Sequence, residues 1–181
     1  MNLISQHCLA GYLYRIHMNE PYGNPFIWSV IDYDSMHNLI TNFNDIDFFN
    51  IEMIHDDHMI FSIVIDHSVK VQYVHYRFDP TATTIIGNRD NKIGGDIRYN
   101  RIWEYIFEKY MSRLFIMQKT NTPPLFCICN FNTVFKDAIY TNDQLDSLAN
   151  FDNVIIHRGC EHMAPLPAAA HFYSSHLTKF K

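Results

Sequence analysis

The sequence has no cluster of basic residues and no long apolar run. The first absence argues against a nucleic-acid partner, and the second argues against a membrane span. Lys and Arg number 14 against 19 Asp and Glu, which gives a formal net charge of −5 at pH 7. Without a Lys/Arg run, the chain offers no electrostatic grip to nucleic acid or to an anionic membrane. No apolar stretch approaches the roughly 18 residues of a membrane span. We therefore predict neither a nucleic-acid partner nor membrane insertion.

A secretory signal and a disulfide framework are also missing. Residues 1–5 lack the basic segment and apolar stretch of a signal peptide, so we predict a cytoplasmic protein. The four cysteines are irregularly spaced, which in a chain without a signal indicates reduced thiols. They are Cys8, Cys127, Cys129 and Cys160.

Signatures of a cofactor or metal are weak. Gly87 and the pair Gly94-Gly95 lack the spacing of a phosphate-binding loop. Residues 55–58 and 157–162 contain histidines, acids and a cysteine, and the second segment offers His157, Cys160 and His162 as zinc ligands. No Cys-x-x-Cys pair supports either segment. We therefore predict no cofactor and no metal.

What is present indicates one α/β domain. A chain of 181 residues, 48% of them hydrophobic, is long enough to bury a full core. The pattern of apolar residues predicts a mixed sheet with flanking helices, and a tail at 163–181 that is either a wrapped arm or partly mobile. Helical spacing covers 9–16, 36–43 after a cap at Asp34 or Ser35, 99–112 and 142–150, where Thr141 and Gln144 form a capping box. Strand patterns cover 59–65, 69–76, 83–86, 113–118, 124–130 and 153–157. The link Asp66-His67-Ser68 is short enough for a hairpin, and the final strand, helix and strand suggest a right-handed crossover between parallel neighbours.

Cys8 is the most informative candidate for chemistry. It follows a strand-like start at Leu3 and Ile4 and precedes a helix-like run from Leu9. A cysteine at a helix N-terminus has a lowered pKa, which favours the nucleophilic thiolate, and the same amides can hold an oxyanion. The alternative is a small buried apolar residue, which is the more common role of a lone cysteine. The pair Cys127 and Cys129 lies in an apolar strand and is best explained by core packing.

A nucleophilic cysteine needs a base, and His75 is the best-placed histidine. Two-residue alternation puts it on the face of Val69, Val71 and Tyr73, which we expect to look into the core or a cleft. A satisfied core histidine is the competing interpretation. Asp79 is a candidate for the orienting third residue, with Asn88 and Asp90 as alternatives, although each also suits a turn. Gln6 is a candidate oxyanion donor, or a loop residue bonded to backbone.

The segment 4–8 with Gly11, followed by Asn24-Pro25-Phe26, resembles the start of a bacterial family of unknown function encoded in exopolysaccharide and capsule loci. Residues 74–76, the helix at 98–113 and the segment 151–157 follow in the same order. A related group is described as papain-like cysteine peptidases. The resemblance therefore implies a papain-like arrangement with Cys8 on a helix and His75 on a strand. Residues 79–95 look like an insertion relative to that family, and Gln6-His7 replaces an Asn-rich pair.

These observations favour a cysteine-dependent enzyme of acyl transfer or hydrolysis. The link to a surface polysaccharide or its precursor comes only from the resemblance, and no signature identifies an acyl donor or a peptide groove. The competing hypothesis is a non-catalytic binding or assembly module for polysaccharide biosynthesis, in which Cys8 is buried. A glycosyltransferase-like enzyme is a third possibility, suggested by the late strand–helix–strand unit, but no paired-acid metal motif supports it. The sequence does not predict the oligomeric state.

Overall fold

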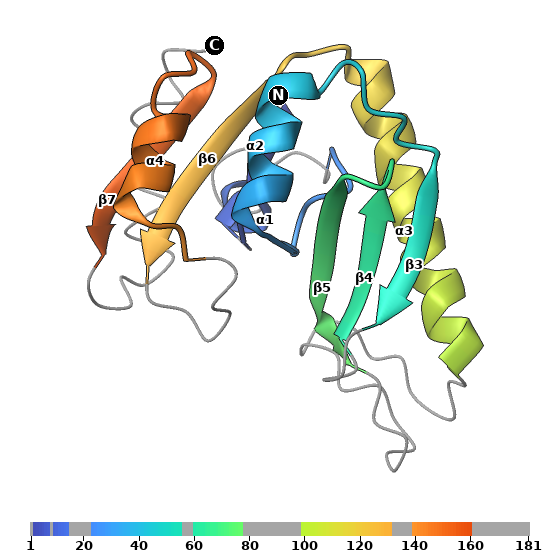
Figure 1. The fold of residues 1–181 in the computed structure, drawn as a ribbon. Helices are drawn as coiled ribbons and strands as arrows, with labels where there is room; N and C mark the ends of the chain where they lie inside the picture. The colour runs from blue at the N-terminus through green and yellow to red at the C-terminus, as the bar shows by residue number, and fades with distance from the viewer. Residues whose placement is uncertain are drawn as a thin grey trace.

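The computed structural model describes residues 2–7, 9–14, 23–55, 60–77, 99–131 and 139–160 (Figure 1). The predicted strand at 83–86, the tail at 163–181 and four of the candidate site positions named below lie outside these residues. In chain order the elements are β1 (Asn2–Ser5), α1 (Leu9–Leu13), β2 (Val30–Ile31), α2 (Tyr33–Asn42), β3 (Ile51–His55), β4 (Ile60–Ile65), β5 (Val69–Arg77), α3 (Tyr99–Thr120), β6 (Pro124–Phe131), α4 (Asn142–Leu148) and β7 (Val154–Cys160).

The strands form two sheets of opposite character. Three parallel strands lie in the order β1-β6-β7, and four strands paired in antiparallel fashion lie in the order β2-β5-β4-β3. The two sheets meet where the backbone N–H of Ile31 in β2 donates to the carbonyl of Gln6, just after β1, at 2.9 Å. The mixed α/β class predicted from the sequence is confirmed, and so is the parallel pairing of β6 with β7.

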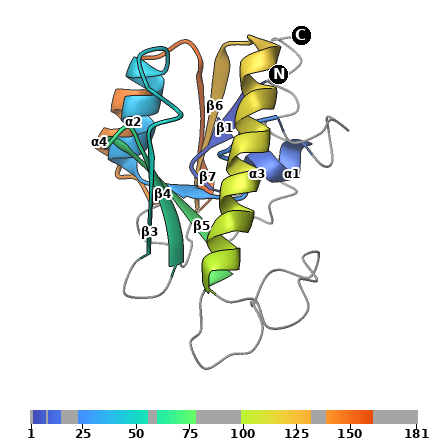
Figure 2. The ribbon, with the colours of Figure 1, turned by 90° about the vertical axis from the view of Figure 1, so that its right-hand side faces the viewer.

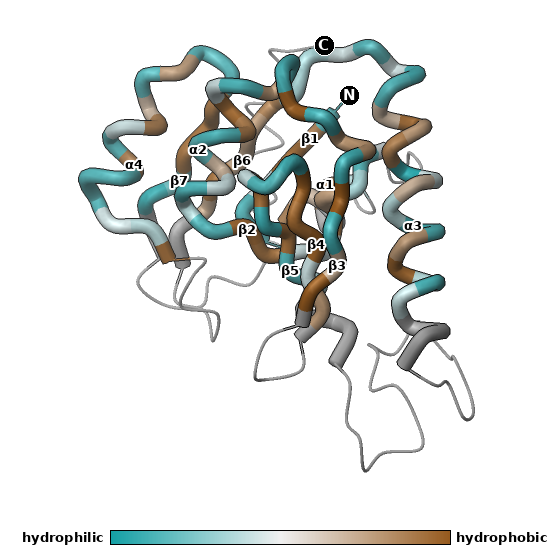
Figure 3. Tube along the Cα trace, turned by 45° about the vertical axis from the view of Figure 1, so that its right-hand side comes forward, coloured by the Kyte–Doolittle hydropathy of each residue, from teal (hydrophilic) through white to brown (hydrophobic). Residues whose placement is uncertain are grey.

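Helices cover both faces of the parallel sheet. Figure 2 shows α2 and α4 on one side of it, with α1 and α3 on the other. In Figure 3 the apolar residues of β1, β4 and β6 lie inside this assembly, whereas the helices alternate between apolar and polar positions. The buried core runs through both sheets and includes Ile4, Leu39, Ile63, Val71, Leu114, Phe126 and Leu148. Among the described residues, no helix is both long and apolar enough to span a membrane.

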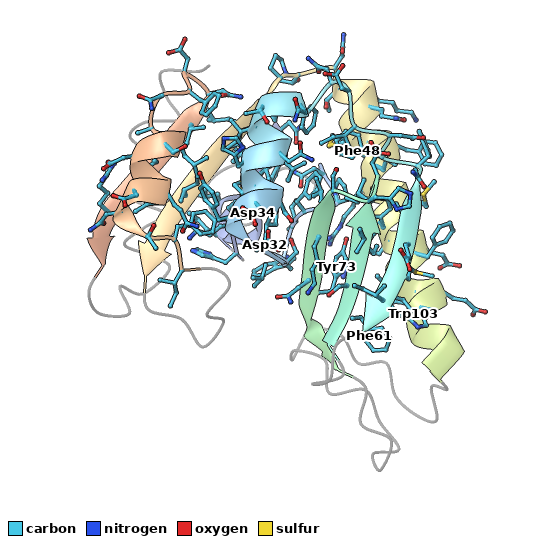
Figure 4. All side chains as sticks on the ribbon, viewed as in Figure 1. Asp32, Asp34, Phe48, Phe61, Tyr73 and Trp103 are labelled. Atoms are coloured by element: carbon cyan, nitrogen blue, oxygen red, sulfur yellow. The ribbon has the colours of Figure 1, made fainter. Side chains whose placement is uncertain are left out.

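The starts of α2 and α4 are fixed by side-chain caps. Thr141 and Gln144 form the predicted capping box of α4, with both reciprocal hydrogen bonds present. The predicted cap of α2 at Asp34 or Ser35 is wrong, because Asp32 is the N-cap and its carboxylate accepts from the Ser35 amide at 2.8 Å. Figure 4 labels Asp32 and Asp34 at this end of α2. An acidic residue in the first turn, such as Asp34, also interacts favourably with the helix dipole. The sequence alone therefore does not distinguish Asp34 from the N-cap Asp32.

The long helix α3 corrects the prediction of a strand at 113–118. Ile106, Tyr110, Leu114 and Met117 are all buried and are three or four residues apart, so the apolar stripe of a helix continues past residue 112. The neighbouring Phe115 and Ile116 are exposed. Their apolar side chains on the solvent side made this stretch look continuously strand-like. At the other end of α3, Trp103 packs edge-to-face on Phe61 of β4 (Figure 4).

The predicted hairpin between 59–65 and 69–76 is confirmed as β4 and β5. Its turn has Asp66 at φ 49° and His67 at φ 56°, and the Ser68 amide donates to the Ile65 carbonyl at 3.0 Å. Two consecutive residues with positive φ match the twist of paired antiparallel strands. The sequence analysis missed β2, which has two residues, and β3, in which Glu52 interrupts the apolar pattern.

Candidate functional site

The carboxyl end of β1 is held against β6 by two side chains. β1 pairs with β6 up to Ser5 and Cys127. Beyond that pair, the Gln6 side-chain oxygen accepts from the backbone N–H of Cys129 at 2.9 Å, and Nε2 of His7 lies 2.9 Å from the Cys129 carbonyl oxygen. Gln6 and His7 thus extend the β1–β6 contact after the backbone ladder ends. Both side chains are buried.

The chain then turns directly into α1. The Ser5 hydroxyl donates to the carbonyl of His7 and accepts from the Ala10 amide at 2.9 Å. The helix-like run predicted for 9–16 is confirmed as α1 over Leu9–Leu13. Residues 15 and 16 of that predicted run lie outside the described part of the chain. The Ser5 bonds fix the turn that leads from β1 into α1.

His7 is a buried neutral imidazole with a defined tautomer. Its Nδ1 accepts from the Leu9 amide at 3.3 Å, so the ring proton is on Nε2, which donates to the Cys129 carbonyl. Burial lowers the pKa of His7 from 6.5 to about 4, and the hydrogen bond to Cys129 offsets part of this effect. Both ring nitrogens are engaged in holding the turn. His7 therefore positions the backbone on both sides of Cys8 and is not a free base.

The predicted site residues are unevenly covered by the structure. Cys8 and Asp79 lie outside the described residues, as do the alternatives Asn88 and Asp90. His75 is in β5, but its side chain is not among those described. Gln6 is fully buried, and its amide oxygen is bonded to backbone, as its structural interpretation predicts. That bond fixes the orientation of the amide group and leaves the oxyanion role a prediction.

One loop, residues 23–29, separates α1 from the half of β5 that contains His75. On the α1 side, a Cβ atom at Gly11 would lie 2.5 Å from Cε2 of the Trp28 indole, so the ring rests on the helix backbone. On the other side, the Tyr73 hydroxyl of β5 donates to the Pro25 carbonyl at 2.9 Å (Figure 4). Val69, Val71 and Tyr73 are buried, as expected for one face of β5. The loop thus brings α1 and the later part of β5 to a common neighbourhood.

Substituting Gly11→Ala is expected to destabilise the protein by about 1–2 kcal/mol. Overpacking against Trp28 costs about 1–3 kcal/mol, and the better helix propensity of alanine returns up to about 1 kcal/mol. Urea unfolding of G11A, W28L and the double variant measures the coupling between the two positions. G11A in the W28L background is expected to be neutral or stabilising. A G11A cost that persists without the indole would contradict the close contact.

The structure also brings together a cysteine and a histidine that the sequence analysis did not pair. Sγ of Cys129 in β6 lies 3.8 Å from Nδ1 of His157 in β7. His157 is half-buried, which lowers the pKa of its imidazole. Cys129 is fully buried, and burial raises the pKa of the neighbouring Cys127 thiol. The pairing depends on the β6–β7 register, which places residue 129 opposite residue 157 and has no local sequence signal.

The segments 55–58 and 157–162, which contain metal-ligand residue types, gain no support as metal sites within the described part of the chain. No group of three or more His, Cys, Asp or Glu side chains there is arranged to hold a metal ion. Part of each segment lies beyond those residues, namely 56–58 and 161–162. His157 itself is next to Cys129.

Comparison with known proteins does not assign the chain to a family. The chain matches no model of a known protein family and no curated protein. The resemblance to the exopolysaccharide-locus family therefore stays a prediction.

Proposed function

We propose that the protein is a thiol-dependent enzyme of acyl transfer or hydrolysis, with Cys8 as nucleophile. The supporting observation is the join between the two sheets at Gln6, whose carbonyl accepts from Ile31 at 2.9 Å. Sites in α/β proteins are typically found at the carboxyl ends of parallel strands where the strand order changes. Cys8 follows His7 in the sequence at this join, and the structure fixes both of its neighbours, His7 and Leu9, by hydrogen bonds.

The remaining residues have roles that follow from this chemistry. His75 takes the thiol proton as general base, and Asp79 orients its imidazole. Gln6 donates its amide to the oxyanion of a tetrahedral intermediate, with its orientation set by the bond to Cys129. The Cys8 thiolate attacks a carbonyl carbon, forms a thioester and expels the leaving group with a proton from His75. Water or an acceptor hydroxyl then cleaves the thioester, which regenerates the thiol.

The substrate and location in this proposal come from the sequence. The resemblance to an exopolysaccharide-locus family supports a surface polysaccharide or its precursor as substrate, and a papain-like arrangement of cysteine and histidine. The irregular spacing of the four cysteines, which indicates reduced thiols, supports action in the cytoplasm. The contacts of the loop 23–29 with Gly11 and Tyr73 support the pairing of Cys8 with His75, because they connect α1 and β5.

Selective alkylation of Cys8 tests the proposal. Iodoacetamide is expected to label Cys8 with an apparent pKa well below the reference of about 8.5. At neutral pH, His75→Ala and the milder His75→Gln are expected to slow labelling about tenfold, because the thiolate loses its imidazolium partner. Mass spectrometry of the labelled peptides distinguishes Cys8 from Cys127, Cys129 and Cys160. Cys127 and Cys129 are expected to stay unlabelled in the folded protein because they are fully buried.

His67→Asn is the matched control, since His67 is an exposed turn residue whose positive φ Asn also tolerates. It is expected to leave the labelling rate unchanged. Circular dichroism of each variant shows whether it is folded, so slower labelling through loss of the base is distinguished from slower labelling through unfolding. Labelling of Cys8 only after unfolding would overturn the thiol enzyme.

That result would favour a second candidate, a non-catalytic binding or assembly module. The observation that favours it is the burial of the groups around Cys8. Gln6 and His7 are at most 5% exposed, both side chains bond to the backbone of Cys129, and His7 also accepts from the Leu9 amide. Such bonds fully explain the two residues as structural. In the module, Cys8 would pack in the same region without chemistry.

A further inference from the structure

A cleft lies at the opposite end of the parallel sheet from Gln6 and His7. It has a volume of about 550 Å³, within the range of small-molecule sites. Its walls are the amino ends of β1 and β6, the residue before β7, and the final turns of α2 and α3 with the segments that follow them. Figure 1 shows the ends of α2 and α3 and the start of β6 gathered at the top of the molecule.

The lining is rich in side-chain amides and poor in charge. Six of the lining residues are Asn or Gln, two are Thr, and one, Asp45, is ionisable. An amide both donates and accepts hydrogen bonds without carrying charge. The amide positions are Asn2, Asn42, Asn44, Gln118, Asn121 and Asn153. A site of this composition suits a neutral ligand with many hydrogen-bonding groups.

Asn2 supplies a second, independent observation. It is 2% exposed, it lines the cleft, and its side-chain oxygen is buried without a hydrogen-bond partner in the described structure. A buried acceptor without a partner destabilises the fold, so it is rarely kept without one. A ligand hydroxyl in the cleft would satisfy it.

Other lining groups are available for the same kind of contact. Within the described residues, no hydrogen bond engages the amides of Asn44, Gln118 or Asn121. Others are partly engaged, because Nδ2 of Asn42 donates to Asn38 at 2.6 Å and Nδ2 of Asn153 lies 3.4 Å from the Pro124 carbonyl. Both of these amides keep an oxygen that can accept. The helix ends add carbonyl acceptors, since the last carbonyls of a helix have no partner within it.

The apolar part of the lining suits the carbon face of a sugar ring. Phe43 is half-buried, and its ring centroid lies 5.1 Å from that of Phe48, which also lines the cleft. Aromatic rings next to hydrogen-bonding amides present an apolar and a polar surface together. A divalent cation fits less well, because it prefers several carboxylates and the lining has only Asp45.

We propose that this cleft binds a neutral saccharide through the amides at the ends of β1, α2 and α3. Asn2 accepts from a sugar hydroxyl, Gln118 and Asn121 hydrogen-bond at the rim, and Phe43 packs on the ring. The proposal is independent of the thiol chemistry, since the cleft and Gln6 lie at opposite ends of the parallel sheet. A Cys8→Ala variant is therefore expected to bind saccharide like the unmodified protein.

Titration of the full chain with neutral mono- and disaccharides of glucose, galactose, mannose and N-acetylglucosamine, followed by ¹H–¹⁵N NMR, tests the proposal. At least one sugar is expected to give saturating shifts at millimolar concentration, confined to backbone amides around the cleft. The double variant Gln118→Ala and Asn121→Gly is expected to weaken binding about tenfold, because two neutral hydrogen bonds are lost. Glycine suits residue 121, which has φ 43°. This variant leaves buried Asn2 intact, so folding is preserved.

Asn150→Ala is the matched control, because Asn150 is an exposed amide after α4, outside the cleft. It is expected to leave the affinity unchanged. The proposal is overturned if no sugar of the panel shifts these resonances, or if the double variant binds as tightly as the parent. Saturation by calcium chloride in place of every sugar would assign the cleft to a cation and overturn it as well.

Discussion

Lowering the pH from 7 to 4 is expected to reduce the free energy of unfolding by about 3 kcal/mol through His7 alone. Burial holds the folded pKa of His7 at about 4, against 6.5 for the exposed imidazole. One pKa unit corresponds to 1.36 kcal/mol. The unfolded chain takes up the proton first, so His7 costs no stability above pH 6.5 and increasingly destabilises the fold as the pH falls towards 4.

Urea unfolding at several pH values measures this effect. His7→Gln keeps a donor for the Cys129 carbonyl and removes the titrating group, so its stability is expected to fall less steeply over this pH window. His67→Asn, at an exposed turn, is expected to keep the steep dependence of the parent. A His7→Gln variant with the parent's slope would contradict a buried neutral imidazole at this position.

Replacing Phe126 by alanine is expected to cost about 3–5 kcal/mol. Phe126 is fully buried in the central strand of the parallel sheet, where its ring packs edge-to-face with Phe43 of the segment after α2. Removing a buried aromatic ring loses its transfer free energy and leaves a cavity. Domains of this kind have a free energy of unfolding of only about 5–15 kcal/mol, so the variant is expected to lose a large part of its stability.

Phe115→Ala provides the matched comparison. Phe115 is 51% exposed on α3, where its ring contacts Phe49, so its truncation is expected to cost less than about 1 kcal/mol. The midpoint of urea unfolding at unchanged m-value reports both variants. Similar losses for Phe115 and Phe126 would contradict the layer arrangement of the core.

Caps and turns are formed by residues that are close in the sequence, and the sequence predicted the elements that depend on them. The capping box at Thr141 and Gln144 identified the start of α4, and the Asp66-His67-Ser68 link predicted the β4–β5 hairpin. Local signals failed where tertiary contacts decide. The two residues of β2 form a strand because β5 lies beside them, and exposed Phe115 obscured the helical stripe of α3.

The same distinction applies to the candidate site. The order of Cys8 and His75 in the sequence suggested a thiol site, and the turn after β1 was visible as a change from strand to helix pattern. The bonds of Gln6 and His7 to Cys129 were not visible, because they join residues more than 120 positions apart. The Cys129–His157 contact and the amide cleft likewise depend on register between distant segments.

The position of β1 has a consequence for the order of folding. Among the described strands of the parallel sheet, β1 pairs with β6, so Asn2 cannot pair until Pro124 has been synthesised. By contrast, β4 and β5 are linked by three residues. Contacts of such long sequence separation form slowly, and a nascent chain emerges from its N-terminus. On the ribosome, the antiparallel hairpin is therefore expected to form while β1 is still unpaired. Until β6 has been synthesised, the apolar residues of β1 stay unpaired, and chaperones bind such transiently exposed apolar segments.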